Sequence, residues 1–159
     1  MNTAYLLIGG NLGDRAAYLQ QAIKQIEALC GRITHTSSIY ETAAWGNTNQ
    51  PAFYNQAIQL TTSLPPETLL AQLLAIEIEM GRVRTQKYGP RTIDLDILMM
   101  DDKVLDTNTL TIPHPQLHNR RFALLPLAEI APSLHHPILD KTVSELLVNC
   151  PDTLDVQKK

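Results

Sequence analysis

The chain has 159 residues, a length that predicts a single domain covering residues 1–159. Apolar residues make up 44% and charged residues 18%, as in ordinary globular proteins, and a net charge of −3 argues against a nucleic-acid-binding class. Cys30 and Cys150 lack metal-type spacing, and the N-terminal apolar stretch is too short for a signal peptide or membrane span, so we expect a cytoplasmic protein.

Hydrophobic spacing and turn residues predict an alternating series of elements. In chain order they are a strand at 5–8, a helix at 14–29, strands at 33–40 and 53–62, a helix at 67–80, a strand at 93–100, and helices at 121–130 and 143–149. The first hundred residues follow the order β-α-β-β-α-β, which is the ferredoxin-like pattern. The predicted fold class is α+β, with a mainly antiparallel sheet and extra C-terminal helices. No functional signal follows Ala131, and residues 156–159 are expected to fray.

Two carboxylates in the strand at 93–100 form the most informative feature of the sequence. Asp94 and Asp96 alternate with Ile93, Leu95 and Ile97. Because residues i and i+2 of a strand point to the same face, both acids would lie on one face and the apolar residues on the other. Two like charges about 7 Å apart repel, and a hard divalent cation such as Mg²⁺ would neutralise them.

Basic residues precede this acidic pair. Arg82, Arg84 and Arg91 all lie within fifteen residues of it. Acids that hold a metal beside arginines that hold phosphate are recurring parts of phosphoryl transfer. The simpler interpretation is that the acids belong to the solvated face of a half-exposed strand.

The run Gly-Pro-Arg-Thr-Ile-Asp-Leu-Asp-Ile-Leu at 89–98 resembles the signature of the 6-hydroxymethyl-7,8-dihydropterin pyrophosphokinase family of folate biosynthesis. Other blocks resemble that family in the same order, at 5–12, 41–55, 81–84, 110–115, 120–122 and 126–132. The resemblance covers about residues 4 to 132. Collinear blocks of this kind are far more specific than one pair of acids.

The resemblance implies transfer of pyrophosphate from ATP to the hydroxymethyl group of the pterin, with release of AMP. It implies that Asp94 and Asp96 bind Mg²⁺, with two ions expected, and that ATP is the co-substrate. No Gly-x-x-x-x-Gly-Lys-Ser/Thr loop occurs in the sequence, so side chains must hold the phosphates. The resemblance gives catalytic roles to Arg82, Arg91 and Asp96 and ATP-binding roles to Arg84, Lys87, Tyr88, His114 and Arg120.

A reduced pterin is flat and carries hydrogen-bonding groups on its edge, so its site needs aromatic faces and polar partners. Phe53 and Phe122 are the two phenylalanines of the chain, and both fall on family positions that sandwich the pterin. Asn55 matches the amide that pairs with the pterin edge, and Thr42, Ala43 and Trp45 match the loop beside it.

Two roles stay open at this point. The proton of the pterin hydroxyl could pass to Asp96, to a metal-bound oxygen or to solvent. Glu77 either supports the nucleotide site or is an exposed helix residue.

Two other classes of protein share the predicted topology. A ligand-binding module without turnover would leave the arginines unexplained. An RNA-recognition domain would need aromatic residues and a basic face on its central strands, where this chain has acids. We expect a monomer, which is the rule in the family.

Overall fold

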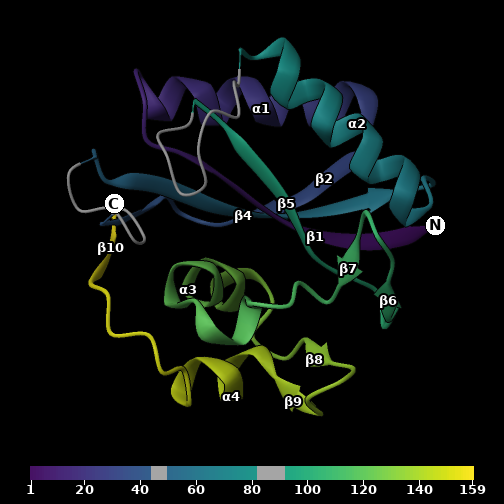
Figure 1. Cartoon of the computed structure of the whole chain (residues 1–159), viewed down its shortest axis with the longest axis vertical. Helices are drawn as coiled ribbons and strands as arrows, with labels where there is room; N and C mark the ends of the chain where they lie inside the picture. The colour runs from purple at the N-terminus through teal and green to yellow at the C-terminus, as the bar shows by residue number, and fades with distance from the viewer. Residues whose placement is uncertain (44–49, 82–91) are drawn as a thin grey trace.

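The computed structural model describes residues 1–43, 50–81 and 92–159. Its centre is an antiparallel sheet with helices on both faces (Figure 1). The strands of this sheet are β1 (Asn2–Gly10), β2 (Arg32–Thr36), β3 (Tyr40–Thr42), β4 (Phe53–Thr62), β5 (Asp94–Met100) and β10 (Val156–Lys158). Their order is β10-β3-β4-β1-β5, and β2 also pairs with β4. The predicted α+β class with an antiparallel sheet is confirmed.

Helices lie on both sides of the sheet. Helices α1 (Arg15–Leu29) and α2 (Pro66–Glu79) cover one face, and α3 (Arg121–Ile130) and α4 (Val143–Val148) lie on the other side (Figure 1). On that second side α4 packs against α3, further from the strands (Figure 1). Two short hairpins and a turn of 3-10 helix complete the C-terminal half. These are β6 (Leu105–Asp106) with β7 (Thr111–Ile112), β8 (His135–His136) with β9 (Lys141–Thr142), and the 3-10 helix Leu117–Asn119.

The main helices begin where the sequence predicts. Asp14 caps α1, and its carboxylate accepts a hydrogen bond of 3.1 Å from the backbone N–H of Ala17. Pro66 occupies the first turn of α2, where a missing N–H costs nothing. Gly81 follows α2 with a φ of 87°, a conformation that a side chain would disfavour.

Each face of the sheet has its own apolar cluster. Alternate residues of the central strands, such as Leu6, Ile58 and Leu95, are buried against α1 and α2. Leu7 and Leu98 belong to the second cluster, with residues of α3 and α4. A register shift between β1 and β5 leaves Leu98 without a cross-strand partner in that pairing.

Two details of the sequence prediction are wrong. The predicted strand at 33–40 is divided into β2 and β3, because Ser37 leaves the strand and its hydroxyl accepts from the N–H of Ala57 at 2.9 Å. The tail does not fray, since β10 pairs with β3 and the N–H of Lys159 donates to the carbonyl of Ile39 at 2.8 Å. No helix in the described ranges is long and apolar enough to cross a membrane.

Candidate active site

A row of cross-strand neighbours brings the predicted pterin amide and a predicted metal ligand to one face. Gly9 of β1 pairs with Asn55 of β4 on one side and with Asp94 of β5 on the other. Directly opposite residues of antiparallel strands share a face. Since adjacent strands lie about 4.8 Å apart, the backbones of Asn55 and Asp94 are roughly 10 Å apart, with Gly9 between them.

Asp96 lies on the same face as Asp94. It pairs with Leu7, which packs into the apolar cluster beneath α3, so both acids face the α3 side of the sheet. Both are half-buried, whereas Ile93, Leu95 and Ile97 are at most 4% exposed on the opposite side. The predicted division of this strand into an acidic and an apolar face is confirmed.

Gly9 is a site residue for which the sequence prediction gave no role. A Cβ atom at this position would collide with the side chain of Asn55 and would lie 2.7 Å from the carbonyl oxygen of Tyr54. The absence of a side chain therefore lets the Asn55 amide lie across β1, toward the acidic strand. The signal in the sequence was a Gly-Gly pair at the end of a buried strand.

His114 lies close to the acids. Its backbone N–H donates to the carbonyl of Leu98 on β5 at 2.9 Å. Burial, together with the positive charge of Arg120, lowers the pKa of His114 to about 4, and the charge of Asp94 opposes this shift. The imidazole is therefore neutral at neutral pH. Nδ1 accepts from the N–H of Gln116 at 3.1 Å, so Nε2 carries the proton and is a hydrogen-bond donor.

The start of α3 brings a cation and an aromatic ring to this region. The guanidinium of Arg120 lies 5.7 Å from the ring centroid of Phe122. Phe122 is partly buried against the cluster beneath α3. Arg120 therefore interacts electrostatically with His114, and its guanidinium also lies beside the ring of Phe122.

The other predicted pterin residues lie on β3 and at the start of β4. Thr42 pairs with Phe53, and Ala43 follows as an exposed residue. Thr42 is 2% exposed, and its hydroxyl has no hydrogen-bond partner within the part of the chain that the structure describes. A buried hydroxyl in this state fits a polar ligand edge, because leaving such a group unpaired is costly.

Glu77 is not an exposed helix residue, so that alternative is wrong. It is 2% exposed, and its carboxylate accepts a hydrogen bond of 2.7 Å from the N–H of Leu95. Leu95 lies between Asp94 and Asp96, so Glu77 holds the backbone of the acidic segment from the outer edge of β5.

Two residues to which the sequence prediction gave no role fix the backbone just before β4, the strand that carries Asn55. Asn11 is buried and donates to the carbonyl of Pro51 at 2.9 Å. Arg15 donates to Glu41 at 3.0 Å and to the carbonyl of Ala52 at 2.8 Å. A cation in the first turn of a helix is locally unfavourable, and that was the available signal for Arg15.

Some predicted site residues lie outside the described residues. These are Trp45 of the pterin set and Arg82, Arg84, Lys87, Tyr88 and Arg91 of the ATP and catalytic sets.

The acidic pair fits Mg²⁺. In 1–43, 50–81 and 92–159, no group of three or more His, Cys, Asp and Glu residues is placed to hold a metal. Mg²⁺ is usually bound by one or two carboxylates together with water and substrate phosphates, so two half-buried acids on one face suit it.

Comparisons with known proteins identify the family of the chain. The family profile described as 7,8-dihydro-6-hydroxymethylpterin-pyrophosphokinase (HPPK) matches residues 5–132. A 2-amino-4-hydroxy-6-hydroxymethyldihydropteridine pyrophosphokinase of Aquifex aeolicus (strain VF5) is 43% identical over 145 residues, which are 91% of this chain and 90% of the relative. The protein of the same name in Bacillus subtilis (strain 168) is 45% identical over 130 residues, or 81% and 78% of the two chains.

Solved structures share the fold. The wild-type HPPK-DHPS of Plasmodium falciparum, crystallised with SDX-DHP, aligns with a TM-score of 0.74 at 19% identity. The alignment covers 94% of this chain and 43% of that one.

Fold and matches together define the class as an ATP-dependent transferase of pyrophosphate. The chain belongs to the 7,8-dihydro-6-hydroxymethylpterin-pyrophosphokinase family. Its reaction is the transfer of pyrophosphate from ATP to 6-hydroxymethyl-7,8-dihydropterin in folate biosynthesis, and like kinases generally it depends on Mg²⁺.

Proposed function

We propose that pyrophosphoryl transfer takes place on the α3 side of the sheet, at the end of β1. The observation that supports the proposal is the row Asn55–Gly9–Asp94 on one face of the sheet. We propose Asn55 as the pterin amide and Asp94 as a metal ligand. The two reactants would meet above Gly9, where no side chain intervenes.

The pterin occupies the β3–β4 side of this row. Asn55 offers a donor and an acceptor to the pterin edge, and the buried Thr42 hydroxyl offers a further polar contact. Phe53 and Phe122 hold the two faces of the ring. Ala43 and Trp45 complete the proposed pterin set.

The nucleotide occupies the β5 side. Asp94 and Asp96 hold Mg²⁺, with two ions proposed, and bound Mg²⁺ supplies neutralisation of the phosphate charge. His114 donates from Nε2 to a phosphate oxygen, and Arg120 adds a positive charge beside it. Arg82, Arg84, Lys87, Tyr88 and Arg91 complete the ATP site, with catalytic roles for Arg82 and Arg91.

The fixed tautomer of His114 suits this role. Because Nδ1 accepts from the N–H of Gln116, the proton of the neutral ring lies on Nε2, and this donor is oriented before ATP arrives. Asp96 is the candidate among the described residues to accept the hydroxyl proton of the pterin. We further propose a single domain over residues 1–159 that acts as a cytoplasmic monomer.

Paired variants test the division into two halves. Asn55→Ala should weaken pterin binding and leave Mg²⁺-dependent binding of a non-hydrolysable ATP analogue unchanged. Asp94→Asn should weaken Mg²⁺-dependent analogue binding and affect pterin affinity less. Equilibrium titration of each variant with each ligand decides between the outcomes. If both variants lose the same ligand, or neither loses any, the proposed arrangement is wrong.

A further inference from the structure

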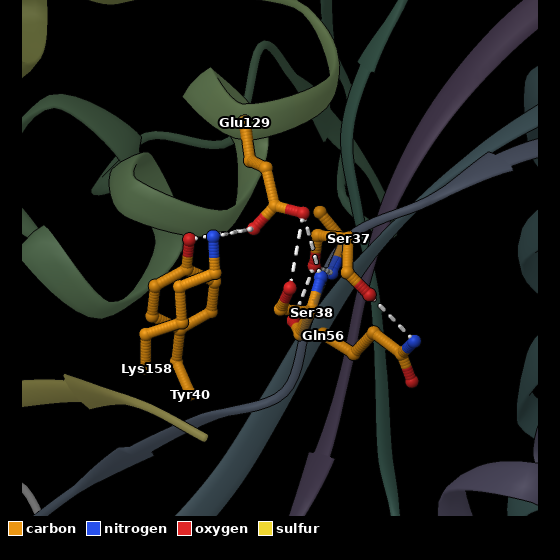
Figure 2. Close-up of polar contacts among 7 residues, drawn as sticks. Ser37, Ser38, Tyr40, Gln56, Glu129 and Lys158 are labelled. Atoms are coloured by element: carbon orange, nitrogen blue, oxygen red, sulfur yellow. Dashed lines mark hydrogen bonds and ion pairs between the residues drawn. The ribbon is translucent and has the colours of Figure 1, made fainter.

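A carboxylate outside the reacting region ties α3 to the edge of the sheet. Glu129, in the last turn of α3, accepts from the N–H of Ser38 at 2.9 Å and from its hydroxyl at 3.2 Å. It also accepts from the hydroxyl of Tyr40 at 2.7 Å, and the ammonium of Lys158 lies 3.7 Å away. Figure 2 shows these groups converging on the carboxylate from β10, from β3 and from the segment before it.

The contacts in this cluster shift the pKa values of Glu129 and Tyr40 in opposite directions. Burial alone would raise the pKa of Glu129, but the hydrogen bonds from Tyr40 and Ser38 and the charge of Lys158 outweigh it, so the pKa is lowered. Burial, with the hydrogen bond to Glu129 and its charge, raises the pKa of Tyr40 to about 12. The phenol therefore donates and the carboxylate accepts across the physiological range.

The Tyr40 end of this hydrogen-bonded contact lies beside the proposed pterin site. Tyr40 is 6% exposed, and it is the cross-strand partner of Asn55. Two residues further along β3, Thr42 pairs with Phe53. The position of the Tyr40 backbone therefore sets the position of the polar wall of the pocket.

Glu129, the other partner in this contact, lies on the helix that carries Phe122, the proposed aromatic side of the pterin site. Phe122 lies seven residues before Glu129 on α3, which is about two helical turns, so the two side chains share one side of the helix. The Tyr40–Glu129 hydrogen bond thus joins the helix that carries Phe122 to the strand whose partner carries Asn55.

The strand needs such support. β3 has three residues, and outside it lies β10, another strand of three residues near the chain end. Ser37, just before β3, is fixed to β4 through Ala57 and Gln56 (Figure 2). A short strand near a sheet edge is readily displaced, so side-chain contacts decide how far α3 lies from it.

We propose that Tyr40 and Glu129 are positioning residues for the pterin, because their hydrogen bond fixes the distance between the Phe122 wall and the Asn55–Thr42 wall of the pocket. Neither residue lies on the β5 side of Gly9, to which the proposed function assigns the phosphates. The proposal rests on the pterin pocket described under the proposed function.

The test compares Tyr40→Phe, which removes one hydroxyl, with Glu129→Gln, which keeps the shape but not the charge. Both should raise KM and Kd for the pterin by about threefold to tenfold, since Tyr40→Phe removes the hydrogen bond to the carboxylate and Glu129→Gln removes the charge that strengthens it. The values of kcat and of KM for ATP should stay within about twofold of wild type. In the double variant the effects should be less than additive, because both substitutions weaken the same Tyr40–Glu129 contact.

Glu145→Ala is the matched control. Its carboxylate also accepts a backbone N–H, that of Thr142 at 2.9 Å, but it caps α4. This control should lower Tm and leave KM for the pterin unchanged. If Tyr40→Phe and Glu129→Gln behave in the same way, the pair only stabilises the fold and the proposal is wrong.

Phe122→Ala separates failure of this proposal from failure of the pocket. If Phe122→Ala raises KM for the pterin while Tyr40→Phe and Glu129→Gln do not, the pocket stands and the positioning role is refuted. If Phe122→Ala also leaves pterin affinity unchanged, the pocket assignment fails and the positioning role falls with it.

Discussion

The two faces of the central sheet use the same alternating strands for opposite purposes. On the face toward α1 and α2, residues such as Leu6, Ile8 and Ile58 are fully buried and form a continuous apolar cluster. On the α3 side, apolar residues continue only as far as Leu7 and Leu98, and then Asn55, Gly9 and Asp94 follow. A strand can thus carry a core on one side without limiting the chemistry on the other.

The largest effect on the α3 side should come from the acids. Asp94→Ala or Asp96→Ala should lower turnover on the order of 10³-fold or more, because the charge on the phosphates loses its stabilisation. The free energy of unfolding should change little, since both residues are half-buried. Steady-state AMP formation measures the turnover, and urea unfolding measures the free energy of unfolding.

Asp102→Ala is the control for these variants. Asp102 is exposed just beyond the far end of β5. Its substitution should leave turnover at the wild-type level. Wild-type activity in Asp94→Ala would show that the acidic face of β5 is not needed for the reaction, and the contrast between a reactive face and a core face would be wrong.

The face toward α1 and α2 should respond in the opposite way. Ile58→Ala deletes a fully buried side chain on β4 and should lower the free energy of unfolding by about 2–5 kcal/mol. At a temperature where the variant stays folded, kcat should remain near wild type. A loss of kcat without a loss of stability would show that the apolar face takes part in the chemistry.

A third substitution tests whether the α3 side has separate binding sites for the pterin and the nucleotide. Phe122→Ala should weaken pterin binding by about tenfold to a hundredfold, through loss of an aromatic face. Binding of an ATP analogue should stay nearly unchanged. Parallel titrations with the two ligands give the answer, and equal losses for both ligands would contradict a separate pterin half.

The smallest effect should be a pH dependence of the stability that the Glu129 contacts give to the packing of α3 on the sheet. The pKa of Glu129 lies below its ordinary value of 4.5 in the folded protein. Its contribution to stability is therefore fully present above that value and is lost as pH falls through the lowered pKa. The difference in unfolding free energy between wild type and Glu129→Gln should be constant above about pH 5 and shrink on acidification. If the difference in unfolding free energy between wild type and Glu129→Gln grew on acidification, the pKa of Glu129 would be raised in the folded protein, which contradicts this account.

Local pattern was sufficient for much of the fold and for the acidic face. The helix start at Asp14, the strand Phe53–Thr62 and the alternation around Asp94 all follow from short-range chemistry that the sequence displays directly. The resemblance to a known family supplied the reaction, and the comparisons confirm that family.

Contacts between residues far apart in the chain could not be predicted from the sequence. The strand β10 forms because β3 offers it an open edge more than a hundred residues away, and nothing in its own residues predicts that edge. The burial of Glu77 depends on where Leu95 lies relative to α2. The role of Gly9 depends on the side chain of Asn55, which is a neighbour only in the folded sheet.

Product analysis tests the central claim most directly. The protein is mixed with ATP, Mg²⁺ and 6-hydroxymethyl-7,8-dihydropterin, and AMP is separated from ADP, with Asp94→Ala and Asn55→Ala in parallel. We predict AMP that requires both pterin and metal, is lost in Asp94→Ala, and is restored in Asn55→Ala by raising the pterin concentration. Formation of ADP, or AMP formation that is indifferent to Asp94, would contradict the assignment of this face as the site of pyrophosphoryl transfer.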